Sequence, residues 1–236
     1  MKLLLTSAGI SNPSIAEALD ELLGKPVAES TALLIPTAIH PFPGGAGMAY
    51  EAITGAASSP LAGLGWKSLG VLELTALPTI RPESWVPMVR EADALLVWGG
   101  DVLYLCHWMR ESGLADLLPS LESVYVGVSA GSIAVTPYNC DAEFDLEFVP
   151  DGSDMASHAE PLALVDFTLY PHFGDADMPD TSRANIERWA SGIPVPTYAI
   201  DDATAIRVVD GTVDVISEGE WELFTPPATG PAMHET

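Results

Sequence analysis

Short apolar runs alternate with helical patterns through the first two thirds of the chain, and this alternation restricts the fold more than any other feature. Strands are predicted for Lys2–Thr6, Leu33–Pro36, Ser68–Leu74, Ala94–Trp98 and Val124–Val128. Helices are predicted after the N-cap and first-turn proline Asn12-Pro13, over 83–91 and over 103–111. Such alternation indicates right-handed βαβ units and a flavodoxin-like, mainly parallel α/β sheet with helices on both faces.

The last third of the chain has a different pattern. A strand over Val165–Tyr170 and a helix over 182–191 precede a hairpin. The hairpin joins Thr204–Val209 to Thr212–Ser217 through Asp210-Gly211, and Trp221–Phe224 would lengthen it. We expect an antiparallel extension of the same sheet, in one domain spanning residues 1–236, with a loosely ordered tail after about residue 226.

Charge and the apolar pattern exclude several classes of partner. The 33 acidic residues outnumber the 9 basic ones, and the net charge of −24 repels nucleic acid and anionic membranes. No apolar run is long enough for a transmembrane helix, and Leu3–Leu5 is too short for a secretion signal. Cys106 and Cys140 form neither a disulfide framework nor a metal motif. The expectation is a cytoplasmic monomer or homodimer without metal or cofactor.

The segment Gly127-Val128-Ser129-Ala130-Gly131 fits the G-x-S-x-G pattern at the end of a predicted strand. A sharp turn from strand to helix would expose the Ser129 side chain, and the N–H groups after it would face a developing negative charge. Alternatively, the small residues let a helix pack closely on the strand. The pentapeptide does not distinguish a nucleophile from packing.

A serine nucleophile needs a base within hydrogen-bond reach. The five histidines of the chain are His40, His107, His158, His172 and His234. His172 is the best candidate, because VDFTLYPHFGD places it beyond the carboxyl end of a strand, as Ser129 is, and open parallel sheets bind ligands at such ends. His40 also follows a strand, whereas the other three lie in a helical pattern, a polar loop and the tail. The separation of 43 positions between Ser129 and His172 leaves no room for the long excursion usual in α/β-hydrolases.

A second turn, in LLVWGGDVLYL (95–105), places Gly99-Gly100 at another strand end. A glycine pair lets backbone N–H groups approach a substrate closely, as an oxyanion hole requires. It is equally compatible with a plain tight turn.

Together these segments resemble the dipeptidase E (α-aspartyl dipeptidase) and cyanophycinase family of serine peptidases. The resemblance is carried by LLLTSAGISNPSIAEAL, TALLIPTA, WGGDVLYL, GVSAGSIAVTP, VDFTLYPHFGD and AIDDATAIRVVDG. It implies a sheet related to class I glutamine amidotransferases, Ser129 as nucleophile, His172 as general base, and the N–H groups of Gly100 and Ala130 as the oxyanion hole, without a metal. The family generally has asparagine where this chain has Asp101, which would add negative charge near the oxyanion.

The resemblance leaves two further residues to assign. In TPYNCDAEFDLEF, a match without gaps implies Asp141 as the third triad member, which we take as the main assignment, and a match with one inserted residue implies Asp145. An arginine beyond the histidine binds the substrate aspartate in peptidase E, and Arg183 lies near the matching place. The alternative for Arg183 is a surface i,i+4 pair with Glu187.

The function expected from these residues is that of a peptidase E-type serine peptidase, which forms an acyl-enzyme on Ser129. Its substrates would be small peptides, including dipeptides with N-terminal Asp. One alternative is a cyanophycinase-like hydrolase of β-Asp-Arg linkages. The other is a non-catalytic binding protein that uses the same scaffold.

Overall fold

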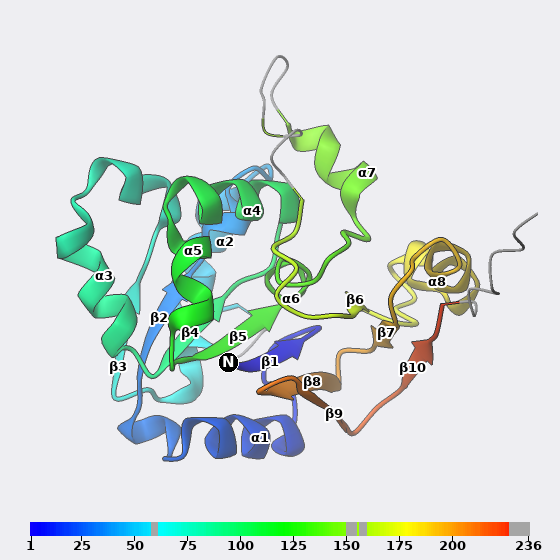
Figure 1. The fold of residues 1–236 in the computed structure, drawn as a ribbon, viewed down its shortest axis with the longest axis horizontal. Coiled ribbons are helices and arrows are strands. Elements are labelled where there is room, and N and C mark those ends of the chain that lie inside the picture. The colour runs from blue at the N-terminus through cyan, green and yellow to red at the C-terminus, as the bar shows by residue number, and fades with distance from the viewer. Residues whose placement is uncertain (58–60, 150–154, 156–159, 227–236) are drawn as a thin grey trace, which may run out of the picture.

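A large mixed sheet forms the centre of the computed structural model, which describes residues 1–57, 61–149, 155 and 160–226. Within these residues the sheet has seven strands in the order β3-β2-β4-β5-β1-β8-β9 (Figure 1). They are β1 (Lys2–Thr6), β2 (Thr31–Ile35), β3 (Ser68–Val71), β4 (Ala94–Val97), β5 (Val124–Val128), β8 (Thr204–Val209) and β9 (Thr212–Ser217). Strands β1 to β5 pair in parallel, while β8 pairs antiparallel with β1 and with β9. This arrangement confirms the predicted α/β class and the antiparallel extension by the hairpin.

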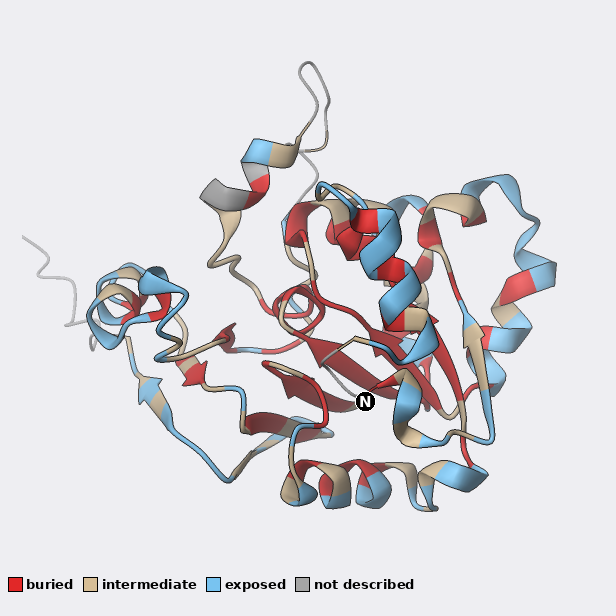
Figure 2. Ribbon diagram, turned by 180° about the vertical axis from the view of Figure 1, so that it is seen from behind, coloured by how far each residue is buried: buried red, intermediate tan, exposed pale blue. Residues whose placement is uncertain are grey.

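Helices cover both faces of the large sheet. Their bounds are α1 (Pro13–Leu23), α2 (Gly45–Thr54), α3 (Pro82–Glu91), α4 (Val102–Glu111), α5 (Leu114–Leu117), α6 (Ala130–Ile133), α7 (Ala142–Asp145) and α8 (Arg183–Ala190). Because side chains alternate along a strand, Leu3 and Leu5 of β1 pack with α3, α4 and α5, whereas Leu4 packs with α1 and α2. In Figure 2 the sheet is buried and α1 turns its buried side toward it. The side chain of Asn12 caps α1 as predicted, by accepting from the Ile15 N–H.

A second, three-stranded sheet stands beside the first, in the order β10-β7-β6. Its strands are β6 (Thr168–Tyr170), β7 (Thr197–Ile200) and β10 (Trp221–Phe224); β6 is parallel to β7, and β10 is antiparallel to it. The prediction that Trp221–Phe224 lengthens the hairpin is therefore wrong. Two hydrogen bonds between Asp201 and Glu220 turn the chain after β9 toward β7 instead. The single domain stays a prediction, and the tail predicted to be loose lies mostly outside the described residues.

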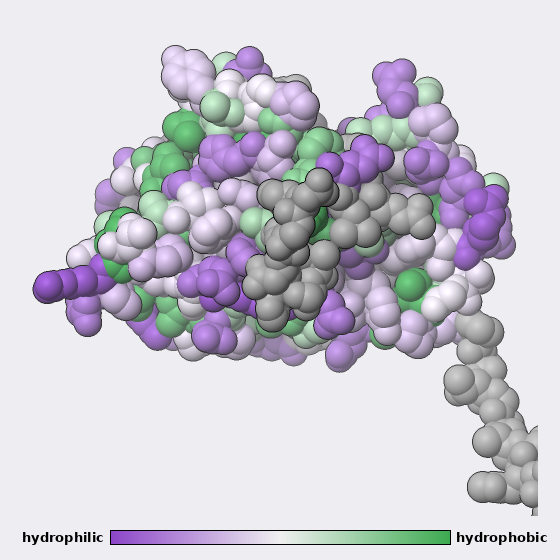
Figure 3. Space-filling view, turned by 90° about the horizontal axis from the view of Figure 1, so that it is seen from above, coloured by the Kyte–Doolittle hydropathy of each residue, from purple (hydrophilic) through white to green (hydrophobic). Residues whose placement is uncertain are grey.

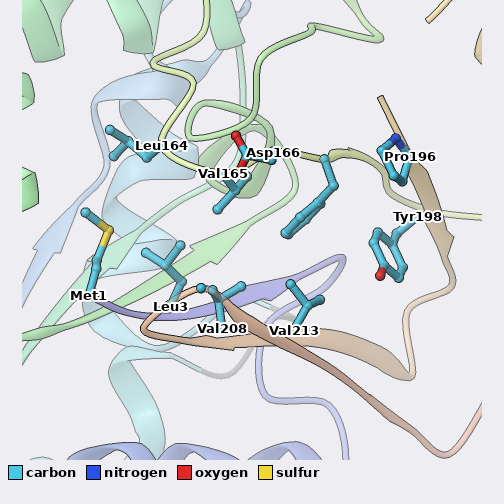
Figure 4. Close-up of a pocket in the computed structure, with 11 residues that line it drawn as sticks. Met1, Leu3, Leu164, Val165, Asp166, Pro196, Tyr198, Val208 and Val213 are labelled. Atoms are coloured by element: carbon cyan, nitrogen blue, oxygen red, sulfur yellow. The ribbon is translucent and has the colours of Figure 1, made fainter. Parts of the chain in front are cut away.

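A cavity of about 260 Å³ lies between the two sheets, and both apolar residues and Asp166 line it (Figure 4). Leu3 and Val208 line it from the large sheet, and Phe167 and Tyr198 from the region of the small sheet. These residues lie toward the beginnings of β1, β6 and β7. The carboxyl ends of these strands, and of β4 and β5, are therefore at the opposite edge, which is where parallel sheets bind ligands.

Hydrophilic residues cover most of the face seen in Figure 3, and hydrophobic residues are scattered among them. This distribution agrees with the net charge of −24. In the described part of the chain, no helix is both long enough and apolar enough to cross a membrane.

Candidate active site

Ser129 occupies the sharp turn between β5 and α6. Its backbone has φ 48° and ψ −112°, a region that a residue with a side chain rarely adopts. Hydrogen bonds hold this conformation: the Ser129 N–H donates to the Thr6 carbonyl over 3.0 Å, and the Ser132 hydroxyl donates to the same carbonyl over 2.8 Å. This strand–turn–helix geometry is the one expected of a nucleophile elbow.

The glycines around Ser129 are required by close backbone contacts. A Cβ atom at Gly127 would lie 2.7 Å from the Gly131 carbonyl oxygen. One at Gly131 would collide with the Val97 carbonyl oxygen at the end of β4. The G-x-S-x-G pattern therefore has a steric cause, because α6 begins directly against β4 and β5.

His172 faces Ser129 from the small sheet. Its Nε2 lies 3.1 Å from Ser129 Oγ, across 43 residues of sequence. It lies two residues beyond the end of β6, and its φ of 58° is again in the left-handed region. The serine and histidine predicted as nucleophile and base are thus brought into hydrogen-bond distance.

The carboxylate behind His172 is that of Asp202. Asp202 Oδ1 lies 2.8 Å from His172 Nδ1. The hydrogen bond from His172 lowers the pKa of Asp202 below its ordinary value; burial opposes this shift, and the Ser7 hydroxyl reinforces it. An ionised carboxylate at Nδ1 orients the imidazole so that Nε2 can accept a proton from Ser129.

The carboxylate that hydrogen-bonds His172 is therefore not one of the two expected from the sequence. Among the described residues, neither Asp141 nor Asp145 hydrogen-bonds its ring; Asp145 accepts instead from Asn139 Nδ2 over 2.8 Å. Asp202 follows β7, and β7 runs parallel to β6, so that both strands deliver their next residues to the same edge. The sequence signal for Asp202 is an acid pair directly after the apolar run TYAI, for which no strand is predicted from the sequence.

The glycine turn after β4 lies against the elbow serine, because a Cβ built at Gly99 would be 3.3 Å from Ser129 Cβ. A Cβ at Gly100, whose φ is 139°, would collide with the Ala38 carbonyl oxygen. Among the described residues the N–H groups of Gly100 and Ala130 donate to no protein acceptor. Asp101 turns its carboxylate toward α4, where it accepts from the Tyr104 N–H over 2.7 Å, and burial raises its pKa to about 6. As a helix cap, the Asp101 carboxylate faces the N-terminus of α4, whose N–H groups stabilise its negative charge.

Two hollows lie beside these residues. One, of about 570 Å³, is lined by Asp141, Tyr170 and Arg188 among others, between the loop after α6 and helix α8. Burial, the largest effect, raises the pKa of Asp141, as does the charge of Asp180, while the charge of His172 lowers it. A second hollow, of about 410 Å³, is lined by His172 itself. Tyr170, two residues before the predicted base, lines the larger hollow, whereas His172 and Ser129 are not among its lining residues.

Arg183 is already paired within the protein. Its Nε and Nη2 donate to the two carboxylate oxygens of Glu222 over 2.8 and 2.6 Å, and its Nη1 donates to Glu187 over 3.0 Å. The i,i+4 pair considered as its alternative role is therefore present. The arginine of α8 that lines the larger hollow is Arg188.

Asp145 is fully buried, and its Oδ1 has no hydrogen-bond partner among the described residues. Burial raises its pKa to about 7, and the charges of Asp101 and Asp141 act in the same direction. A folded-state pKa above the unfolded value means that the native state binds the proton more tightly. The contribution of Asp145 to the free energy of unfolding is therefore fully present below the unfolded pKa, and it is lost as pH rises through about 7.

Asp145→Asn is expected to increase the free energy of unfolding at pH 8 by about 1–3 kcal/mol, because the variant buries no charge there. Near pH 4, where the native carboxyl is neutral, the two proteins should differ much less. Urea unfolding across this pH range measures the difference. Asp116→Asn, which removes an exposed carboxylate of α5, is the control. A stability difference that does not change with pH would contradict the assignment.

Comparison with known proteins places these residues in a family context. The model of Peptidase family S51 matches residues 3–216 of the chain. A curated Peptidase E from Nostoc sp. (strain PCC 7120 / SAG 25.82 / UTEX 2576) is 25% identical over 150 residues. That match spans 60% of this chain and 60% of the length of the Nostoc protein.

Two solved structures share the fold. A protein described as a peptidase E candidate from Listeria monocytogenes EGD-e superposes with a TM-score of 0.64 at 20% identity, over 92% of this chain and 98% of the other. A peptidase from an acI-B1 actinobacterium superposes with a TM-score of 0.55 at 17% identity, over 95% and 94% of the two chains. At these identities the likeness concerns the fold.

Proposed function

Because the chain belongs to Peptidase family S51, and is thus a serine-type peptidase of the peptidase E type, we propose that it hydrolyses small peptides through Ser129, His172 and Asp202. The observation that supports this most is the continuous line of contacts from Asp202 Oδ1 to His172 Nδ1, and from His172 Nε2 to Ser129 Oγ. In this proposal Ser129 is the nucleophile, His172 the general base and Asp202 the carboxylate that orients the base.

The reaction follows from these contacts. His172 Nε2 takes the proton of Ser129 as Oγ bonds to the scissile carbonyl carbon, and the resulting oxyanion accepts from the N–H groups of Gly100 and Ala130. Imidazolium then donates its proton to the leaving amine, and the C–N bond breaks to give the acyl-enzyme. Water, deprotonated by His172, attacks the ester; the acid product leaves as Ser129 regains its proton.

The larger hollow is proposed to receive the N-terminal residue of the substrate. Its volume of about 570 Å³ suits a small ligand. Asp141 lines it, and the charge of His172 lowers the pKa of this carboxylate, which supports a role for Asp141 close to the proposed base. A substrate ammonium group beside Asp141 would compensate the burial of that carboxylate. Asp141 thus has a proposed role in binding the free N-terminus of a peptide.

Aspartate at the substrate N-terminus is proposed to be accepted but not required. Arg183, the residue expected to select it, is held by Glu222 and Glu187. Arg188 lines the hollow, but Asp141 and Asp180 line it too, so the site as a whole does not favour an anion. Selection of an acidic side chain, where it occurs, would therefore rest on Arg188.

Leucine release from Ala-Leu, Asp-Leu and N-acetyl-Ala-Leu tests the proposed function. The wild type is expected to cleave both free dipeptides at rates within about tenfold of each other, and to leave the acetylated one intact. Asp141→Asn should raise KM for the free dipeptides about tenfold or more, whereas Asp116→Asn should not, because only the former changes the proposed ammonium site.

Three outcomes would contradict parts of this proposal. Equal cleavage of the blocked and free peptides would remove the role of Asp141. Preference for β-Asp-Arg, added to the same panel, would favour the cyanophycinase-like alternative. Cleavage of no peptide, together with no fluorophosphonate adduct on Ser129, would favour a non-catalytic binding protein.

A further inference from the structure

Ser7 lies directly after β1, is fully buried, and contacts both residues proposed to activate Ser129. Its Oγ is 2.5 Å from Asp202 Oδ1 and 3.1 Å from His172 Nδ1. The backbone N–H of His172 also donates to this oxygen, over 2.9 Å. One hydroxyl therefore meets the carboxylate, the ring and the backbone of the Asp202–His172 pair.

The hydrogen-bonding capacity of Ser7 determines the direction of each contact. A hydroxyl has one proton and two acceptor positions, and an ionised carboxylate can only accept. The Ser7 proton therefore points to Asp202. Its oxygen accepts from the His172 backbone N–H and faces the Nδ1–H of the ring. Each donor and acceptor position of the hydroxyl is thus directed at the pair.

Ser7 also connects the two sheets. His172 and Asp202 follow β6 and β7 of the small sheet, whereas Ser129 follows β5 of the large one. Strand β1 pairs with β5, with Thr6 opposite Val128, so that Ser7 and Ser129 leave adjacent strands at the same level. The cavity between the two sheets lies at the other end of these strands (Figure 4). Ser7 is therefore a direct link from the large sheet to the proposed base.

We propose that Ser7 is a positioning residue: its hydroxyl attaches the His172 backbone and the Asp202 carboxylate to the end of β1, and so sets the distance from His172 Nε2 to Ser129 Oγ. This inference rests on the proposed function of the same site. The left-handed backbone of His172 makes such an attachment more important, because the conformation must be held by its surroundings.

Kinetics of Ser7→Ala test this role. The variant is expected to lower kcat for a cleaved dipeptide about 10- to 100-fold with KM within about twofold, since the base loses its alignment but the substrate hollow is unchanged. Ser30→Ala is the matched control, because Ser30 is also fully buried and donates one hydrogen bond, to Pro26 O over 3.0 Å. Both variants should lose similar thermal stability. Ser7→Thr, which keeps the hydroxyl, should retain a kcat within about fivefold of wild type.

Proton NMR of the substrate-free protein separates failure of this inference from failure of the proposed function. The downfield Nδ1 proton of His172, identified by its loss in His172→Ala, should shift in Ser7→Ala and stay in place in Ser30→Ala. This readout remains valid if the wild type cleaves no peptide, which would contradict the proposed function instead. An unchanged resonance in Ser7→Ala, a kcat within twofold of wild type, or a loss of kcat shared by Ser30→Ala would overturn the role of Ser7.

Discussion

Ser129→Ala is expected to lower kcat for dipeptide hydrolysis by about 10⁴-fold or more, with little change in KM. Alanine leaves the elbow and the unpaired N–H groups of Gly100 and Ala130 in place but removes the atom that forms the acyl-enzyme. Steady-state kinetics measure the loss, and mass spectrometry of the wild type after treatment with a fluorophosphonate should show one adduct, on Ser129. The variant should carry none.

The Ser30→Ala protein is the control for removal of a buried serine hydroxyl, and it should keep its activity and its adduct on Ser129. Equal turnover by wild type and Ser129→Ala would remove the nucleophile assignment. An adduct on another serine would show that the protein is a serine hydrolase with a different nucleophile.

Asp202→Asn is expected to lower kcat by about 10³- to 10⁴-fold. An amide at this position cannot stabilise the imidazolium that forms when His172 takes the proton of Ser129. It can also donate to Nδ1, which would place the ring proton on Nε2 and prevent that nitrogen from accepting. The effect of Asp202→Asn should appear in kcat rather than KM, because Asp202 contacts the proposed base and not the proposed substrate hollow.

Asp141→Asn and Asp145→Asn are the matched controls for Asp202→Asn, since each replaces a carboxylate near the site by its isosteric amide. The first is expected to act mainly on KM, and the second mainly on stability at high pH. If Asp141→Asn instead abolished kcat while Asp202→Asn kept it, the assignment of Asp141 made from the sequence would stand, and the contact of Asp202 with His172 would be incidental.

Much of the large sheet could be predicted from local sequence. Strands β1, β5, β8 and β9 have the predicted bounds, because each is an apolar or β-branched run ended by a turn or a polar residue. The small sheet was not predicted. Its strands contain three or four residues each, and β10 could pair either with the adjacent hairpin or with β7. A short apolar run does not determine which distant strand it pairs with.

The sequence by itself predicted a sharp turn at Ser129 and a strand end before His172, because both depend on local patterns: small residues between a strand and a helix, and apolar runs that stop at polar residues. The tertiary structure alone decided which groups stand behind the base. Asp202 and Ser7 reach His172 through the pairing of β6 with β7 and through the position of β1 beside β5. Asp202 lies 30 positions from His172 in the sequence, and Ser7 lies 165 positions from it. No local preference encodes contacts at such separations.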